Sequence, residues 1–303
     1  MNQLERGLLL LCSNLGDAQI RPLSFAQYRT LRKKVRETGI GSSDPEKPVE
    51  PADLVRLGYS RDAAENIVRL LSRETQLDRY LQRAAQSGIF PVTQWSPDYP
   101  VRMLQVLGDL CPPVLFCAGP RALLRQRAVS LVGSRKLLPP GRHFAARVGQ
   151  LAAQEGVTLV SGGAVGADST AQDACLSAGG TVISFIAEGL LQHAAQPLPA
   201  GLLVCSETGF DLPFSAQRAI SRNRLIHAMG LRTFVAQSAA GSGGTFRGTV
   251  ENLSHGWSPV FVHADGSEGA RQLVLRGATP VLLSRLHSLC GAFPGHRAIP
   301  PAP

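Results

Sequence analysis

The chain has 303 residues, of which 44% are hydrophobic, so it can bury a substantial core and divide into two domains. Its 31 lysines and arginines outnumber its 22 aspartates and glutamates, which gives a formal net charge of +9. This excess suits a polyanionic partner, although a solubilising surface charge would produce it equally well. No apolar run approaches the roughly 18 residues of a membrane span, and no signal peptide is recognisable. We therefore expect a cytoplasmic protein with no membrane partner and with reduced cysteines.

Residues 1–90 carry the pattern of helices. Leucines recur at helical spacing from Leu4 to Leu15, and the spacing continues over Phe25–Val35. A short helix is expected from Asp53 until Gly58 closes it, and Ser60 is placed to cap a further helix over Arg61–Leu71. The pattern predicts a small all-α module of the sterile-alpha-motif or helix-hairpin-helix kind.

From residue 129 onward, apolar β-type runs are each followed by small residues and then by a helical stretch. This alternation predicts a Rossmann-like α/β domain over residues 91–290, with a parallel sheet covered by helices on both faces. The strands are expected at Val129–Val132, Thr158–Val160, Thr181–Ile186, Leu202–Cys205, Thr233–Ala236 and Val260–Val262. Residues 91–128 are interpreted as a connector, and the proline-rich residues 291–303 as a disordered tail.

Four elements that favour anion binding fall around the carboxyl ends of these strands, where parallel sheets bind their ligands. Glycine loops that open helices present main-chain N–H groups to an anion, and arginine is a planar cation suited to phosphate. The candidate phosphate-binding residues are Gly133, Ser134 and Arg135; Ser161, Gly162, Gly163, Gly166 and Asp168; Arg218, Arg222, Asn223 and Arg224; and Ser242, Gly243, Gly244 and Thr245.

Each element also has a purely structural interpretation. The loop at Arg135 could be an ordinary turn with a surface arginine. Asp168 would lie in the first turn of a helix, where its charge suits the helix dipole, so we favour a cap over a catalytic base. The two arginines that flank Asn223 could contact successive phosphates, brace the sheet edge or lie on a solvated helix face. The seven histidines show no metal-ligand spacing, and no catalytic residue, metal or cofactor is assigned.

Taken in order, these motifs resemble those of the DNA-processing protein A (DprA, also called Smf) family. The resemblance spans roughly residues 95–283 and rests on Tyr99-Pro100, Pro112-Pro113-Val114-Leu115-Phe116 with Gly119, Val132-Gly133-Ser134-Arg135, Ser161 to Asp168, Ser206-Glu207, Arg222-Asn223-Arg224, Ser242-Gly243-Gly244, and Leu273-Val274 with Gly277-Ala278. It implies a Rossmann-like, non-enzymatic homodimer that binds and protects single-stranded DNA. It also implies a role in loading the RecA recombinase during recombination or natural transformation.

Two other functions stay open. The chain departs from the family pattern at Val165, where an arginine or lysine usually precedes Gly166, and in the loop from Ser242 to Thr245. That loop, continued to Glu251, also resembles the Lonely-Guy nucleotide phosphoribohydrolases, although it lacks their proline and shifts their glutamate by one residue. The alternatives are thus an enzyme that hydrolyses nucleoside monophosphates and a sensor that binds a small phosphorylated signal without turnover.

Overall fold

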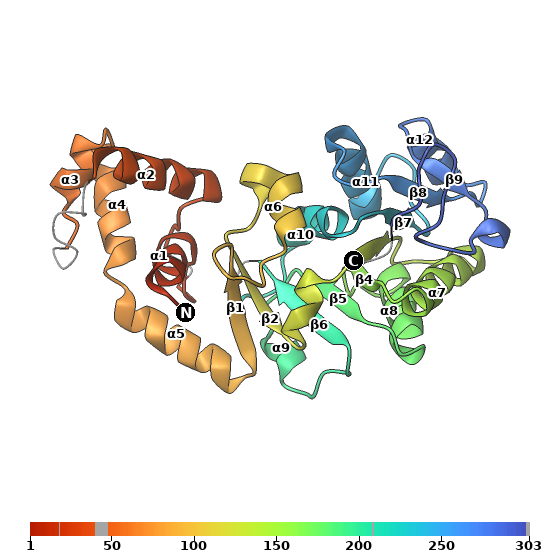
Figure 1. The fold of residues 1–303 in the computed structure, drawn as a ribbon, viewed down its shortest axis with the longest axis horizontal. Coiled ribbons are helices and arrows are strands. Elements are labelled where there is room, and N and C mark those ends of the chain that lie inside the picture. Colours follow the sequence, from red (N-terminus) through yellow and green to blue (C-terminus); the bar gives the residue numbers. More distant parts are fainter. Residues whose placement is uncertain (18, 40–47, 208, 301–303) are drawn as a thin grey trace.

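The computed structural model describes residues 1–17, 19–39, 48–207 and 209–300, and begins with five helices (Figure 1). These helices are α1 (Gln3–Cys12), α2 (Phe25–Thr38), α3 (Pro51–Arg56), α4 (Arg61–Leu71) and α5 (Glu74–Gln86). The Ser60 hydroxyl accepts a hydrogen bond from the Ala63 N–H across 3.3 Å, so Ser60 caps α4 as predicted. The four consecutive leucines of α1, Leu8 to Leu11, are buried and join the core of the molecule, whereas Leu4 is exposed.

A nine-stranded sheet follows. Its strands are β1 (Ile89–Thr93), β2 (Val114–Ala118), β3 (Ala128–Val132), β4 (Thr158–Ser161), β5 (Val182–Phe185), β6 (Leu202–Ser206), β7 (Thr233–Val235), β8 (Val260–His263) and β9 (Thr279–Val281). Their order across the sheet is β1-β2-β6-β5-β4-β3-β7-β8-β9. The seven strands from β6 to β9 in that order pair in parallel, whereas β1 and β2 extend the sheet antiparallel. All six predicted strands are present, and β1, β2 and β9 were missed.

Helices cover both faces of the sheet, as predicted (Figure 1). The helices of this part are α6 (Val101–Leu107), α7 (Pro139–Gln154), α8 (Ala167–Ser177), α9 (Leu191–Ala194), α10 (Ala216–Met229), α11 (Gly243–His255) and α12 (Glu268–Val274), with short 3-10 turns η1 (Gly108–Leu110), η2 (Arg121–Arg125) and η3 (Leu283–Arg285). Side chains of a strand alternate between the faces. Val129 and Leu131 of β3 therefore pack with α7, while Ala128 and Val132 join the core that contains α10 and the N-terminal helices.

Residues 286–300 follow η3 and run along the sheet. The sequence places part of this segment in a disordered tail. Arg232 donates hydrogen bonds to the carbonyl oxygens of Leu289 and Gly291, at 2.7 Å each, and to that of Arg297. The Phe293 ring lies 4.5 Å from the ring of Phe261. Residues 301–303 of that predicted tail lie outside the described residues. Within the described parts of the chain, no helix has the length and apolar character needed to cross a membrane.

The strand order places three of the predicted loops side by side. Strand β3 lies between β4 and β7, and all three run parallel, so their carboxyl ends open on the same edge of the sheet. Helix α8 begins after β4, and helix α11 begins after β7. The N-termini of two helices thus meet the turn at Arg135, as the alternating pattern of the sequence implies.

Candidate functional site

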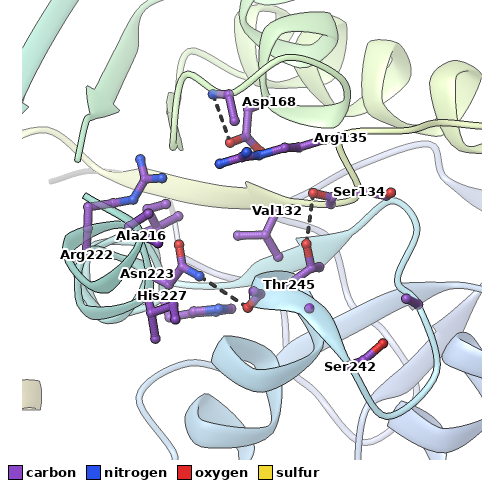
Figure 2. A pocket seen from close by; sticks show the side chains of 18 of the residues that line it. Val132, Ser134, Arg135, Asp168, Ala216, Arg222, Asn223, His227, Ser242 and Thr245 are labelled. Atoms are coloured by element: carbon purple, nitrogen blue, oxygen red, sulfur yellow. Dashed lines mark hydrogen bonds between the residues drawn. The ribbon is translucent and has the colours of Figure 1, made fainter. Parts of the chain in front are cut away.

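A pocket of about 420 Å³ lies beyond the carboxyl ends of β3, β4 and β7 (Figure 2), and we call it the loop pocket. It brings together residues from all four predicted elements. The candidates that line it are Gly133, Ser134, Arg135, Asp168, Arg222, Asn223, Ser242, Gly243, Gly244 and Thr245. The other candidates do not line it, and these are Ser161, Gly162, Gly163, Gly166, Arg218 and Arg224.

The loops that form the pocket pack main chain against main chain. The Ala167 N–H donates to the Ser134 carbonyl oxygen at 3.1 Å, and the Thr245 hydroxyl donates to the Gly133 carbonyl oxygen at 2.9 Å. Gly166 adopts a φ of +104°, and a Cβ there would lie 2.5 Å from the carbonyl oxygens of Ser134 and Arg135. The small residues that the sequence concentrates here are therefore needed for loop-to-loop contact as well as for an open pocket.

Arg135 is an exposed cation at the pocket. Its side chain forms no hydrogen bond or ion pair within the described residues. The hydrogen bonds of the turn are made by Ser134 and Lys136 on either side of it. The Ser134 hydroxyl donates to the Lys136 carbonyl oxygen at 3.0 Å and closes the turn. In Figure 2 the Arg135 side chain lies on the same side of the pocket as Asp168. An anion in the pocket can therefore reach a guanidinium that the fold does not already use.

The N-terminus of α11 is a second set of free donors at the pocket. Helix α11 begins at Gly243, and the side chain of the preceding residue, Ser242, makes no capping hydrogen bond. Gly243 and Gly244 are both exposed. The first N–H groups of a helix have no partner within the helix, and the helix dipole places partial positive charge there. This end of α11 is thus arranged to receive an anion beside Arg135.

Arg222 is placed in the pocket wall but faces inward. Only 6% of the residue is exposed, and its Nη1 donates to the Gly162 carbonyl oxygen at 2.5 Å and to that of Phe185. Burial lowers the pKa of Arg222, and the nearby Asp168 carboxylate opposes this shift. Burial likewise raises the pKa of Asp168, against the attraction of Arg222. The Asp168 carboxylate also accepts the Ala164 N–H at 3.3 Å, so both side chains hold the loop after β4.

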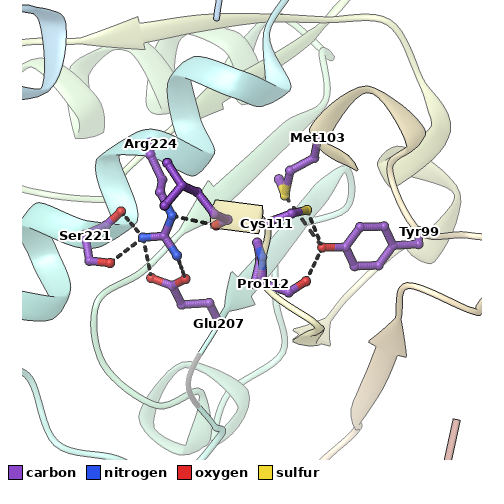
Figure 3. A network of polar contacts seen from close by, with 8 residues as sticks. Tyr99, Met103, Cys111, Pro112, Glu207, Ser221 and Arg224 are labelled. Atoms are coloured by element: carbon purple, nitrogen blue, oxygen red, sulfur yellow. Dashed lines mark hydrogen bonds and ion pairs between the residues drawn. The ribbon is translucent and has the colours of Figure 1, made fainter. Parts of the chain in front are cut away.

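Arg218 and Arg224 are also occupied by protein acceptors. Arg224 forms an ion pair with Glu207, and its Nε donates to the Leu110 carbonyl oxygen at 3.0 Å (Figure 3). Arg218 donates from Nε to the Ala187 carbonyl oxygen at 3.1 Å. Bracing, which the sequence left as an alternative for the arginines beside Asn223, accounts for the contacts of Arg224, and Arg218 is bound to the protein in the same way.

The Tyr99-Pro100 and Pro112-Pro113 motifs meet away from the loop pocket (Figure 3). The buried Tyr99 hydroxyl donates to the Pro112 carbonyl oxygen and lies 3.1 Å from the Cys111 Sγ. Burial raises the pKa of Tyr99 well above its usual value. These motifs thus have a structural role: a buried hydrogen bond joins the start of α6 to the start of β2. They contribute no lining residue to the loop pocket.

Among the lining residues of the loop pocket that sequence reasoning missed, three have side chains that could affect binding: Phe214, Ile220 and His227. Phe214 and Ile220 are exposed apolar side chains at its edge. His227 is buried, its Nδ1 accepts from the Asn252 Nδ2 at 3.1 Å, and burial lowers its pKa to about 3. Phe214 could have been noticed as an aromatic residue just before a polar helix. The burial of His227 has no signal in the sequence, because it depends on how α10 packs.

These features define a Rossmann-like α/β protein whose phosphate-suited pocket opens at the carboxyl ends of its parallel strands. The family model of DNA recombination-mediator protein A matches residues 91–289, and the chain therefore belongs to that family. The predicted resemblance to DprA and Smf proteins is confirmed.

Curated relatives support the same membership. The chain is 30% identical to protein Smf from Escherichia coli K12 over 178 residues, which cover 55% of this chain and 48% of the relative. It is 28% identical over 225 residues to a putative DNA processing protein DprA from Mycobacterium tuberculosis, with 65% of this chain and 55% of the relative covered. The chain thus spans about half the length of the curated relatives it matches.

Solved structures share the fold. DNA processing protein A from Streptococcus pneumoniae superposes with a TM-score of 0.62 at 22% identity, covering 87% of this chain and 97% of that one. DNA processing protein A from Helicobacter pylori, described for its single-stranded DNA binding mode, gives a TM-score of 0.53 at 22% identity and covers 63% of this chain and 90% of that one. At this identity the likeness confirms the predicted fold class and nothing finer.

Proposed function

We propose that this chain binds single-stranded DNA at the loop pocket and acts in DNA recombination without catalysing a reaction. The observation that carries the proposal is the exposed guanidinium of Arg135 beside the uncapped N-terminus of α11. The first is a cation and the second carries the partial positive charge of the helix dipole, and both line one pocket. Such groups suit the phosphates of a nucleic-acid backbone.

The edge of the pocket also offers a surface for bases. Phe214 and Ile220 expose apolar side chains there, which the polar interior of a phosphate site does not require. Bases of single-stranded nucleic acids stack on aromatic side chains, and this contact tolerates any sequence. Apolar and cationic groups side by side favour a polynucleotide over inorganic phosphate.

A small phosphorylated ligand is the second candidate, because a volume of about 420 Å³ also suits a nucleotide. The hydrolase alternative needs an acid at the loop from Ser242 to Thr245. Glu251, the residue considered for that role, lines a different hollow together with Glu207 and Arg224. The carboxylate that lines the loop pocket is that of Asp168, which accepts the Ala164 N–H. These placements favour a binding role for the pocket.

A salt titration of oligonucleotide binding tests the proposal. The logarithm of the binding constant for a fluorescent oligothymidine should fall linearly with the logarithm of the salt concentration. Arg135→Ala should make that slope shallower by about 0.7, the value for one lost phosphate contact. Arg79→Ala is the control, because Arg79 is an exposed arginine on α5, outside the pocket. Unchanged affinity and slope in Arg135→Ala would contradict the proposal. A nucleotide that stabilises the protein thermally, where the oligonucleotide does not, would favour the second candidate.

Membership in the family supports three finer proposals. The chain would form a homodimer, protect the bound strand from nucleases and help to load RecA onto it. Sedimentation at micromolar concentration, nuclease digestion of the complex and RecA filament assembly on the bound strand measure these properties separately. A chain that stays monomeric, leaves the strand open to digestion and leaves filament assembly unchanged would show that these properties do not extend to this member.

A further inference from the structure

Helix α2 presents a row of cations on one side. They stand at positions i, i+3, i+4 and i+7 of the helix, a spacing that places them on one face. They are Arg29, Arg32, Lys33 and Arg36. The other side of α2 buries Phe25, Tyr28 and Leu31 against the core, so the row is held at the surface. Together with Asp109 and Glu37 the row lines an open hollow of about 640 Å³, which we call the α2 hollow.

These cations are held only weakly by carboxylates. Arg29 pairs with Asp109, but the side chains are 58% and 60% exposed. Lys33 and Glu37 are 3.8 Å apart and both exposed. Exposed pairs of this kind contribute little free energy, so a phosphate can replace the carboxylate at small cost. Arg36 is exposed and forms no ion pair or hydrogen bond within the described residues.

Arg32 is held differently. Its guanidinium lies 4.0 Å from the centre of the Trp95 ring, and the Trp95 Nε1 donates to the Tyr28 hydroxyl at 3.1 Å. A guanidinium stacked on an aromatic ring keeps its N–H groups directed outward along the ring plane. Arg32 is therefore oriented by the fold without losing its capacity to bind an anion.

The α2 hollow and the loop pocket each share a lining residue with a third hollow. A middle hollow of about 510 Å³ lies between them, lined by Phe25, Leu110 and Ile220 among others. It shares Ile220 with the loop pocket and Asp109 with the α2 hollow. In the view of Figure 1, α6 lies between α2 on one side and α10 and α11 on the other. The three hollows thus neighbour one another in this order, and we call the series the track.

The two ends of this track differ in charge from its middle. Cations stand at both ends, with Arg135 in the loop pocket and the row on α2. The middle hollow offers apolar surface at Leu110 and Ile220. Three carboxylates also line it: Glu207 is paired with Arg224, Asp109 is paired with Arg29, and Glu251 forms no ion pair within the described residues. Seven residues separate Arg29 from Arg36, or about 10 Å along the helix, which is room for more than one phosphate.

We infer that the basic face of α2 is a second contact for the same strand of single-stranded DNA, which runs from the loop pocket across the middle hollow. The inference rests on the proposed function of the loop pocket and extends it to the N-terminal helices. A strand long enough to span the track contacts both cationic ends, whereas a short strand occupies the loop pocket alone.

Oligonucleotides of two lengths test the inference. Oligothymidines of about 6 and about 20 nucleotides bracket the usual site sizes of single-strand binding folds. The test variant combines Arg29→Gln, Lys33→Gln and Arg36→Gln, which remove three charges and keep good helix formers. The control variant combines Arg61→Gln, Arg69→Gln and Arg79→Gln, which remove three exposed charges from α4 and α5. Circular dichroism and thermal unfolding verify that each variant is folded.

The expected result depends on length. The α2 variant should bind the long strand at least tenfold more weakly at low salt, with a salt slope smaller by about 2, or about 0.7 for each lost contact. Its affinity for the short strand should stay within about twofold of the wild type, and the control variant should bind both lengths normally. Equal losses at both lengths, or no loss at either, would overturn the inference. If Arg135→Ala bound the short strand as tightly as the wild type does, the function proposed for the loop pocket would be overturned instead.

Discussion

Arg222 donates a hydrogen bond from Nη1 to the main-chain carbonyl oxygen of Gly162, across 2.5 Å. This contact turns an arginine that the sequence suggests for phosphate into a support for the glycine loop after β4. The same nitrogen donates to the carbonyl oxygen of Phe185 at the end of β5. Arg222 therefore joins two neighbouring strand ends and fixes the wall of the loop pocket from within.

Replacing Arg222 should thus lower stability before it lowers affinity. Arg222→Ala leaves the carbonyl oxygens of Gly162 and Phe185 without their buried donor, and each buried polar group left unsatisfied costs about 1–3 kcal/mol. Urea unfolding measures this loss. Arg135→Ala is the matched control, because Arg135 is exposed, and it should change the free energy of unfolding by less than about 0.5 kcal/mol. An Arg222→Ala protein that keeps its stability and loses only DNA binding would contradict this role.

Gly166 should be intolerant of a side chain. Its φ of +104° disfavours L-residues, and a Cβ would meet the carbonyl oxygens of Ser134 and Arg135. Gly166→Ala should therefore destabilise the fold by about 1–3 kcal/mol and displace the Arg135 turn, which would weaken oligonucleotide binding as well. Gly7→Ala is the control, since Gly7 lies within α1 with open space around it. That change should stabilise the protein by about 0.5–1 kcal/mol. Equal effects of the two substitutions would show that the close approach at Gly166 is unimportant.

The sequence predicts best where a local signal decides the structure. Ser60 shows this, because a hydroxyl directly before an amphipathic run is a helix start whatever lies around it. The loop after β4 shows it too, because only small residues allow main chains to approach so closely. Strand β2 shows the limit: Val114–Ala118 is a buried apolar run, but it is followed by Gly119, Pro120 and the short 3-10 turn η2, with no α-helix before β3. Its antiparallel pairing with β6 depends on contacts far apart in the chain.

The arginines of α10 show a second limit. Their spacing correctly places Arg218 and Arg222 on one side of the helix, and both donate to carbonyl oxygens that follow or end β5. Spacing alone does not say whether that side faces solvent or the sheet, since a buried arginine with carbonyl partners has the same sequence pattern as a free one. The number of cations available to a phosphate was therefore overestimated from the sequence, and Arg135 is the one of the predicted four that keeps a free guanidinium in the described structure.

Val165 stands where the family pattern usually has an arginine or lysine, so a cation can be introduced there by substitution. Its side chain is 79% exposed in the loop after β4, beside Ala164, which lines the loop pocket. Val165→Arg should increase the affinity for oligothymidine several-fold at low salt and increase the salt slope by about 0.7, because one more phosphate is neutralised. The control is Leu275→Arg, at a side chain that is 84% exposed after α12 and outside the pocket. If both variants gain affinity equally, net charge and not the pocket explains the gain.

His227 should make stability depend on pH. Burial lowers its pKa to about 3, so the folded protein holds a neutral imidazole whose Nδ1 accepts the Asn252 amide hydrogen. In the unfolded chain the imidazole has its ordinary pKa of about 6.5, and between these two values the unfolded state binds the extra proton. The contribution of His227 to stability is therefore complete above about pH 6.5 and decreases as the pH falls toward 3.

Between pH 7 and pH 5 this contribution should decrease by about 2 kcal/mol, because each pH unit below the ordinary pKa costs about 1.4 kcal/mol. Urea unfolding at the two pH values measures it. His227→Gln removes the titrating group and should lose that part of the pH dependence, although its stability at pH 7 is lower because the buried imidazole is lost. His143→Gln, at an exposed position on α7, should keep the wild-type difference between the two pH values. An unaltered pH dependence in His227→Gln would mean that burial does not hold the imidazole neutral. The contact between His227 of α10 and Asn252 of α11 would then need another explanation.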